Sequence, residues 1–267
     1  MTATVAEEQI ALRRVTLTLG THRVLRDVSV TAMRGETTVI LGASGSGKTT
    51  ILRLILGLYR ADSGAILIGG RDITGLTERE LMPVRLEMAM VFQGAALFDS
   101  LTVGENVGYR LWEQRTVSDH EIESRVRRSL TYVGLEDTIG KMPAELSGGM
   151  RKRVGIARAL ASGAQTILYD EPTAGLDPIN TCMTARLIKG LKSQGLTQIV
   201  VTHDLDTAHA VADRIVVVDR GRVIFEGSPE DLKASPLPAI QTFLDPSLLA
   251  AKGVFPRPEL GEWGETP

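Results

Sequence analysis

The chain has 267 residues, 43% of them hydrophobic, which is enough to bury one large core or two small ones. Its 30 Lys and Arg against 32 Asp and Glu give a formal net charge of -2, and only 4% of residues are aromatic, so the composition argues against nucleic-acid binding. One cysteine, Cys182, excludes an internal disulfide and a cysteine-rich metal site. We find no apolar run of about 18 residues and no secretory signal, and therefore expect a cytoplasmic protein that reaches a membrane only through a partner.

The predicted elements alternate between short apolar strands and amphipathic helices. A β-hairpin comes first, because residues 10–19 and 22–33 alternate apolar and polar side chains on either side of Gly20 and Thr21. The next predicted elements are a strand at 37–41, a helix at 48–58, a strand at 66–68 and a strand that ends at 91–92. A mainly helical stretch follows at 100–162 and includes helices at 119–132 and 150–162. The last predicted elements are a strand at 167–169, a helix at 179–193, a strand at 199–201 and a hairpin of 216–218 with 223–225. This order predicts an α/β fold with a mainly parallel sheet.

The C-terminal segment 232–267 differs from the rest because it holds six of the eleven prolines. Proline removes a backbone donor and interrupts regular structure. We therefore predict an extended tail there, without a continuous helix or strand.

A phosphate-binding loop is predicted between the strand at 37–41 and the helix at 48–58. The sequence GASGSGKTT fits the pattern G-x-x-x-x-G-K-S/T, in which backbone N–H groups surround phosphate oxygens. Lys48 supplies a positive charge, and Thr49 offers its hydroxyl to Mg²⁺. The candidate nucleotide-binding residues of the loop are Gly42, Ala43, Ser44, Gly45, Ser46, Gly47, Lys48, Thr49 and Thr50.

Two further segments carry groups suited to phosphate chemistry. Asp170 ends an apolar strand in the sequence TILYDEP, where a carboxylate can hold Mg²⁺, and Glu171 follows it as a candidate to orient or deprotonate a water. In LSGGMRKR, Ser147, Gly148 and Gly149 open a helix and so form a second anion site, with a plain helix N-cap as the alternative for Ser147.

These motifs, with Gln93 before them and His203 after them, resemble ABC ATPases in order and rough spacing over residues 10–228. The resemblance implies a RecA-like P-loop ATPase core, an antiparallel β subdomain and an α-helical subdomain. It implies an ATPase domain at 8–231 with the helical subdomain inserted at about 94–162, and a tail at 232–267. ATP and Mg²⁺ are the cofactors it implies.

The resemblance also implies a role for each matched position. Glu171 resembles the catalytic carboxylate, His203 the switch histidine at the γ-phosphate, and Gln93 the glutamine near Mg²⁺ and the attacking water. Thr49, Gln93 and Asp170 are the implied metal-site residues. Ser147, Gly148 and Gly149 resemble the signature that closes on the γ-phosphate of the opposite protomer, and Asp177 stands at the D-loop position.

One position departs from the family pattern. An aromatic residue usually stacks on adenine before the glycine of the first hairpin, whereas this chain has Leu19 there. We expect apolar contact from Leu19, or a cation–π-like stack from His22 or Arg23.

The sequences FQGAALF at 92–98 and YDEPTAGLDP at 169–178 resemble the ATPase of Mla-type phospholipid transport systems, although Gly94 and Ala95 depart slightly from that group. The implied partners are a second ATPase subunit, an integral membrane permease and an MCE-domain lipid-binding protein, with no nucleic acid. The implied place is the cytoplasmic face of the inner membrane. The alternatives are an importer ATPase for a polar solute and a non-transport ABC ATPase.

Two segments keep two interpretations each. The cluster Arg151, Lys152 and Arg153 is either the solvated face of a helix or a contact for lipid headgroups or a partner. The apolar stretch 95–101, with Tyr109 and Trp112, is either the core of the helical subdomain or a surface that receives a helix of the permease.

Overall fold

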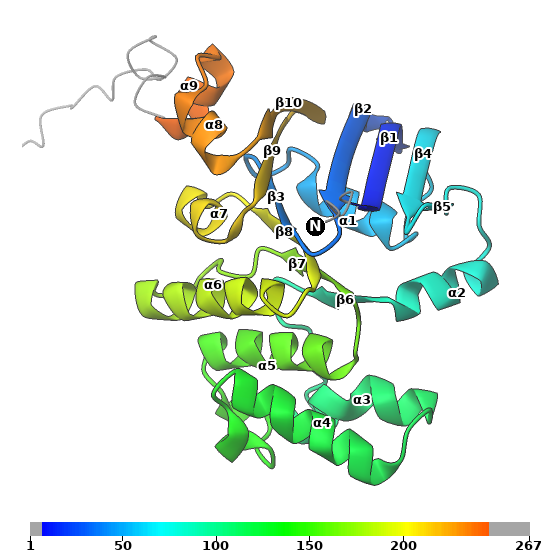
Figure 1. The fold of residues 1–267 in the computed structure, drawn as a ribbon, viewed down its shortest axis with the longest axis vertical. Helices are drawn as coiled ribbons and strands as arrows, with labels where there is room; N and C mark the ends of the chain where they lie inside the picture. The colour runs from blue at the N-terminus through cyan, green and yellow to red at the C-terminus, as the bar shows by residue number, and fades with distance from the viewer. Residues whose placement is uncertain (1–6, 246–267) are drawn as a thin grey trace, which may run out of the picture.

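The computed structural model describes residues 7–245, and its centre is a six-stranded sheet (Figure 1). In spatial order the strands are β10 (Arg222–Gly227), β9 (Arg214–Asp219), β3 (Thr37–Leu41), β8 (Thr197–Thr202), β7 (Thr166–Asp170) and β6 (Met88–Val91). All neighbours pair in parallel except β10 with β9. The expected mainly parallel sheet is confirmed, and its carboxyl edge gathers the ends of β3, β6, β7 and β8.

The central strands are buried on both faces, which explains why their residues are mostly apolar. Successive side chains of a strand point to opposite sides. Ile40 and Leu168 therefore join one buried cluster, whereas Leu41, Ile167 and Tyr169 join the other.

One face of this sheet is covered by α1 (Lys48–Ile55) and a second, antiparallel sheet. That sheet has the order β2 (His22–Met33), β1 (Glu8–Leu19), β4 (Ser63–Ile68) and β5 (Arg71–Asp72). The predicted first hairpin is confirmed, with Leu19 paired to His22 at its end. The helix α2 (Glu78–Leu86) leads from this sheet to β6 (Figure 1).

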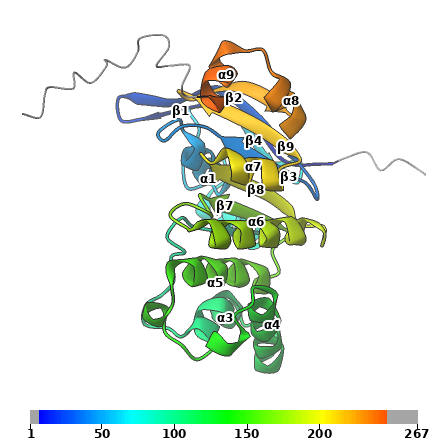
Figure 2. The same cartoon turned by 90° about the vertical axis from the view of Figure 1, so that its left-hand side faces the viewer.

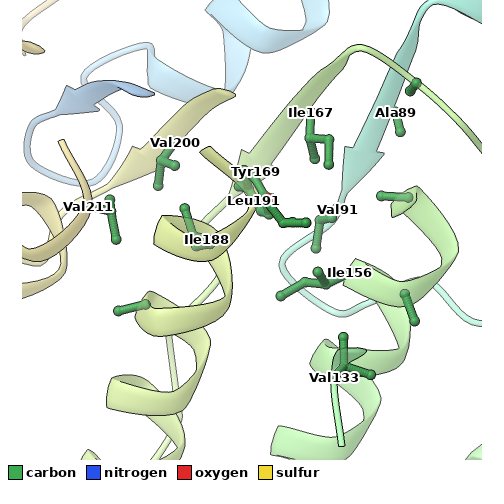
Figure 3. Packing of buried hydrophobic residues seen from close by; sticks show 14 of the residues in the cluster. Ala89, Val91, Val133, Ile156, Ile167, Tyr169, Ile188, Leu191, Val200 and Val211 are labelled. Carbon is green, nitrogen blue, oxygen red and sulfur yellow. The ribbon is translucent and has the colours of Figure 1, made fainter. Parts of the chain in front are cut away.

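The other face is covered by helices, which form successive layers away from the sheet (Figure 2). The first layer is α6 (Pro178–Lys192) with α7 (Leu205–Val211), and beyond α6 lie α5 (Gly148–Ala161), α3 (Val103–Gln114) and α4 (Asp119–Tyr132). Two 3₁₀ turns, Glu136–Thr138 and Pro143–Glu145, connect α4 to α5. Figure 3 shows Ile156 of α5 and Ile188 of α6 directed into the same apolar cluster as Tyr169.

The predicted strands and long helices are confirmed in kind, with shifts of a few residues at their ends. The first helix ends at Ile55 rather than at residue 58, because Gly57 adopts a φ of 65°. The helices α2 and α7 and the two-residue strand β5 have no counterpart among the predicted elements.

The prediction of an extended tail is wrong for its first part. Residues 229–234 and 238–244 form α8 (Pro229–Ala234) and α9 (Pro238–Leu244), and Ile240 is fully buried against the helical face of the sheet. Each helix begins with a proline in its first turn, where the missing N–H costs nothing, so these prolines start helices instead of preventing them. Residues 246–267 lie outside the described part of the chain.

No helix within residues 7–245 has the combination of length and hydrophobicity that crossing a bilayer requires.

Candidate active site

The loop between β3 and α1 is packed so tightly that its first glycine has no substitute. A Cβ on Gly42 would lie 2.2 Å from the carbonyl oxygen of Val218 and 2.8 Å from the Oγ of Ser46. The Oγ of Ser46 is buried, and within residues 7–245 it has no hydrogen-bond partner. The loop leads into the N-terminus of α1, where free N–H groups and the helix dipole favour an anion. This geometry suits a phosphate group.

Lys48, the first residue of α1, directs its ammonium group back over this loop. The residue is 6% exposed, and its Nζ donates hydrogen bonds to the carbonyl oxygens of Gly42, at 2.8 Å, and Ala43, at 3.0 Å. Burial lowers the pKa of Lys48, and the charges of Glu171 and Asp170 offset part of this effect. A buried cation therefore stands at the mouth of the predicted phosphate loop.

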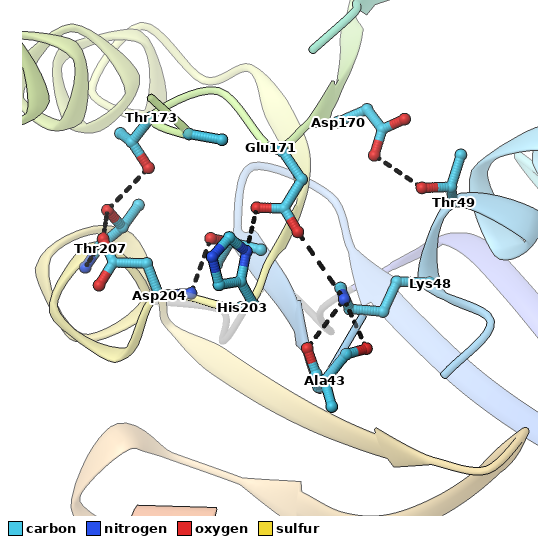
Figure 4. A network of polar contacts seen from close by, with 12 residues as sticks. Ala43, Lys48, Thr49, Asp170, Glu171, Thr173, His203, Asp204 and Thr207 are labelled. Atoms are coloured by element: carbon cyan, nitrogen blue, oxygen red, sulfur yellow. Dashed lines mark hydrogen bonds and ion pairs between the residues drawn. The ribbon is translucent and has the colours of Figure 1, made fainter. Parts of the chain in front are cut away.

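Asp170 ends β7 directly opposite α1. Its Oδ1 accepts a hydrogen bond of 2.9 Å from the hydroxyl of Thr49 (Figure 4). Burial raises the pKa of Asp170 by more than the Thr49 hydrogen bond lowers it, and the carboxylate of Glu171 adds to the rise. The structure thus brings together the hydroxyl and the carboxylate that the sequence predicts as metal-site residues.

We expect Asp170→Asn to stabilise the nucleotide-free chain near pH 8. Because the folded pKa of Asp170 is raised, folding is penalised once the group ionises, and this penalty vanishes below the unfolded pKa of about 4. Asparagine never ionises and keeps an acceptor for Thr49. Urea unfolding without ATP or Mg²⁺ measures the difference, which should shrink as the pH falls to about 4. Equal stability of the two proteins near pH 8 would contradict the prediction.

Glu171 lies in the turn after β7 and faces a histidine and a lysine. Its Oε2 lies 2.9 Å from Nδ1 of His203, and its Oε1 lies 3.7 Å from Nζ of Lys48 (Figure 4). The residue has a φ of 50°, in the left-handed region that a side chain rarely adopts. The N–H of Glu171 donates to the carbonyl oxygen of Val201 in β8, at 2.9 Å, and thereby anchors this backbone. His203 follows β8, so two adjacent strand ends bring the pair together.

An open cavity of about 1150 Å³ extends from this pair. It begins at Ala43 and Ser44 of the loop, passes Glu171 and His203, and ends at Phe243 of α9. Its volume is slightly above the range of about 300–1,000 Å³ that is typical of small-molecule sites. The carboxylate and the imidazole are therefore accessible to a ligand bound at the loop.

The segment Ser147–Gly149 forms a second cluster, on the helical layers. Ser147 caps α5 by accepting a 3.3 Å hydrogen bond from the N–H of Met150, and it is exposed, so the N-cap interpretation is confirmed as geometry. A Cβ on Gly149 would lie 2.7 Å from the side chain of Asn180 in α6. Asn180 in turn donates to Asp177, the N-cap of α6. Asn180 thus links the predicted signature to the predicted D-loop position, a contact that the sequence prediction missed.

Two predicted residues lie outside the Lys48 network. Gln93 is exposed, two residues beyond the end of β6, which neighbours β7. Leu19 is 38% exposed at the tip of the first hairpin, beside His22. The structure leaves both side chains available for a ligand.

The solvated-face interpretation of the basic cluster in α5 is wrong for Lys152. This lysine is 8% exposed, and its Nζ donates a 3.3 Å hydrogen bond to the carbonyl oxygen of Glu171. Arg153 is half-buried and donates to the carbonyl oxygen of Val133. Helical spacing was the sequence signal for the burial of Lys152, because position 152 lies on the same buried face of α5 as Gly149 and Ile156.

The apolar stretch 95–101, with Tyr109 and Trp112, was predicted to be either core or a surface for the permease, and the structure shows both buried and exposed residues in it. Ala95 is fully buried, as a core residue would be. Phe98 and Tyr109 are 44% and 40% exposed, with ring centroids 4.5 Å apart, and Trp112 is 38% exposed. An aromatic surface therefore lies on α3 and the segment before it.

Comparison with known proteins agrees with this geometry. The family model described as "ABC transporter" matches residues 25–174. The chain is 43% identical to the methionine import ATP-binding protein MetN of Rhizobium johnstonii over 88% of this chain, but it spans only 65% of that protein's length. It is 39% identical to the intermembrane phospholipid transport system ATP-binding protein MlaF of Escherichia coli, over 88% of both chains. It is 38% identical to the probable ribonucleotide transport ATP-binding protein mkl of Mycobacterium tuberculosis, over 88% of this chain and 66% of that one.

Solved structures show the same fold. The dimeric ATP-binding cassette MJ0796, in a post-hydrolysis state with ADP and Pi, superposes with a TM-score of 0.75 at 34% identity, over 82% of this chain and 98% of that one. The cbiO1 protein of Clostridium perfringens, part of the transporter complex cbiONQ, gives a TM-score of 0.80 at 28% identity, over 93% of this chain and the whole of that one. The expected RecA-like P-loop ATPase fold is thereby confirmed.

Proposed function

The chain belongs to the ABC transporter family as an ATP-hydrolysing subunit, and we propose that it powers phospholipid transport as a homodimer bound to a membrane permease. The observation that carries the transport assignment is the match to MlaF over 88% of both chains. The steps below derive how the described residues would perform this function.

The phosphate loop and Lys48 bind the triphosphate of ATP. Lys48 exchanges its carbonyl partners for phosphate oxygens, a change that its position over the loop allows. Thr49 and Asp170 would hold Mg²⁺, because a hydroxyl and a carboxylate 2.9 Å apart are the hard oxygen donors that this ion takes beside phosphates. Gln93 completes this set from the end of β6. When bound, Mg²⁺ neutralises charge on the phosphate oxygens.

Glu171 acts on the water that attacks the γ-phosphate. Its carboxylate accepts the proton of that water or orients it. An ionised carboxylate accepts a hydrogen bond from an N–H at Nδ1 of His203, which holds the imidazole ring beside the place proposed for the γ-phosphate. Lys48, on the other carboxylate oxygen, keeps Glu171 close to the phosphate loop.

The second half of each site comes from the partner subunit. Ser147 and Gly148 are exposed at the N-terminus of α5, where the helix dipole and free N–H groups favour an anion, and Asp177 is exposed as the N-cap of α6. They lie on other elements than Lys48 and Glu171. The similar cassette MJ0796 is dimeric with ADP and Pi. In a head-to-tail dimer, Ser147 of one chain would face the γ-phosphate held by Lys48 of the other.

The aromatic surface offers a docking place for the permease. Phe98 and Tyr109 contact each other with their ring planes tilted by 39° while remaining exposed, and Trp112 lies about one helical turn beyond Tyr109. Aromatic side chains of this kind contribute most of the binding energy in protein interfaces. Attachment through this surface would place the chain on the cytoplasmic face of the inner membrane.

Methionine import is the alternative function, and the 43% identity to MetN favours it. The catalytic residues do not separate the two functions, because both use the same hydrolysis. The separating property is the composition of the assembled transporter.

Native mass spectrometry of the complex, purified from membranes through a tag on this chain, tests the proposal. We expect two copies of the chain, a permease, an MCE-domain protein and bound phospholipid. Phe98→Glu is the control, because a charge on the aromatic surface should release the chain from the permease without changing its circular dichroism. A complex that carries methionine and a solute-binding protein, without lipid, would establish the alternative.

A further inference from the structure

Lys152 is a buried cation whose partners are backbone carbonyl groups of the turn Glu171–Ala174. Its Nζ donates to the carbonyl oxygen of Glu171, at 3.3 Å, and to that of Ala174. Burial lowers the pKa of Lys152, and the negative charge of Glu171 offsets part of this effect. Lysine is rarely buried to this degree, because removing its charge from water is costly. Because this burial is costly, we expect the contact between Lys152 and the turn to contribute to the function of the site.

The turn needs such support because of its backbone. The φ of 50° at Glu171 carries a conformational penalty of order 1–3 kcal/mol for a residue with a Cβ. Two backbone hydrogen bonds hold the turn: the N–H of Glu171 donates to Val201, and the N–H of Ala174 donates to the carbonyl oxygen of Glu171 at 3.2 Å. Lys152 adds a charged donor to that same carbonyl oxygen, which strengthens the turn on its other side.

The conformation of this turn decides where the carboxylate points. With its backbone held on both sides, Glu171 directs one oxygen to His203 and the other toward Lys48 (Figure 4). A release of the turn to a negative φ would rotate the side chain away from both partners. A displacement of about 1 Å at a reacting group is enough to lower a rate about 10²-fold.

We infer that Lys152 is a positioning residue for ATP hydrolysis, which fixes the turn Glu171–Ala174 so that the Glu171 carboxylate faces the phosphate loop. The inference rests on the proposed role of Glu171. Lys152 also lies on α5 five residues after Ser147, about 7.5 Å along the helix axis. The helix that presents Ser147 to the partner subunit therefore also holds the backbone turn that carries the Glu171 carboxylate of its own chain.

Lys152→Met keeps an unbranched side chain only one atom shorter and removes the donor. We expect kcat to fall about 10–100-fold, with the KM for ATP and ATP binding by calorimetry unchanged within about twofold. Arg153→Met is the matched control, because it removes a partly buried cation that donates to a carbonyl group of the same helical layer, away from Glu171. The two variants should lose similar unfolding temperature, while only Lys152→Met loses kcat. Equal kcat in Lys152→Met and wild type would overturn the inference.

A double-mutant cycle with Glu171→Gln shows whether Lys152 acts through Glu171. In that background, Lys152→Met should change the residual single-turnover rate less than about twofold. An undiminished effect there, or a loss of ATP affinity equal to the loss of kcat, would overturn the inference. Should Lys152→Met fail to fold, Lys152→Gln and Arg153→Gln replace the pair under the same criteria. A wild-type rate in Glu171→Gln alone would instead refute the proposed function.

Discussion

Glu171→Gln should lower the ATP hydrolysis rate of this chain about 10²–10⁴-fold, which is the contribution of a positioned general base. The amide has the shape of the carboxylate and keeps an acceptor oxygen for Nδ1 of His203, so the fold of the site should remain. It cannot take a proton from water at neutral pH. Release of inorganic phosphate at saturating ATP measures the loss.

The same substitution should retain ATP and enrich an ATP-bound dimer. The carboxylate lies 3.7 Å from Nζ of Lys48, and therefore close to the place proposed for the triphosphate, so its removal relieves a like-charge repulsion. Size-exclusion chromatography with light scattering, with and without ATP, reports the dimer. Glu226→Gln is the control, since Glu226 forms an ion pair with Arg214 on β9 and β10. Steady wild-type turnover in Glu171→Gln would remove Glu171 from its proposed role.

The sequence predicts most of the central sheet because burial on both faces leaves a visible pattern. Strand 167–169 is apolar throughout, and strand 37–41 ends in the apolar run 39–41. Asp170, the polar residue that ends β7, stands at the carboxyl edge where the structure finds it. The association of Lys48, Thr49 and Asp170 follows from the same topology, since the parallel strands β3 and β7, on either side of β8, end at the same edge of the sheet.

The two helices that the sequence analysis missed, α2 and α7, are short, and capping residues mark them better than a periodic pattern of apolar residues does. The helix α2 contains Pro83 and few apolar residues, but Thr77 and Glu80 form a capping box at its start. Asp204 caps the seven-residue helix α7 in a similar way. A search for N-caps would have found both helices.

The missed contacts of the site depend on tertiary packing. The sequence RKR in α5 is highly charged, which favoured a solvated helix face, yet α5 packs against the turn after β7 and buries Lys152. Arg158, on the same helix, donates to the carbonyl oxygens of Ala95 and Ala96, both at positive φ. Local propensity does not encode such long-range contacts to carbonyl groups.

Dimers assembled from two different mutants should show that each ATP is shared between subunits. The two substitutions are Lys48→Ala, which removes the phosphate-binding cation, and Ser147→Asp, which places a negative charge where the γ-phosphate of the partner's ATP would lie. Aspartate caps a helix as well as serine does, so α5 should keep its N-terminus. Any loss of activity then comes from the site and not from the helix.

With one substitution in each subunit, both defects fall in the same composite site and the other site is intact. We expect about half of the wild-type hydrolysis rate for this dimer if the two sites work independently. With both substitutions in one subunit and a wild-type partner, each site has one defect, and the rate should fall at least about tenfold further. Two different affinity tags, used in sequence, isolate each mixed dimer before phosphate release is measured.

The reverse pattern would mean that Lys48 and Ser147 serve the same nucleotide within one chain. In that arrangement the doubly substituted subunit loses its own site only, and its wild-type partner keeps the other. The separation of the two clusters favours the shared arrangement, because Lys48 begins a helix packed between the two sheets whereas Ser147 begins α5 on the opposite, helical side (Figures 1 and 2). In this arrangement, the negative charge of each triphosphate attracts the N-terminus of α5 of the other chain, and hydrolysis weakens that attraction.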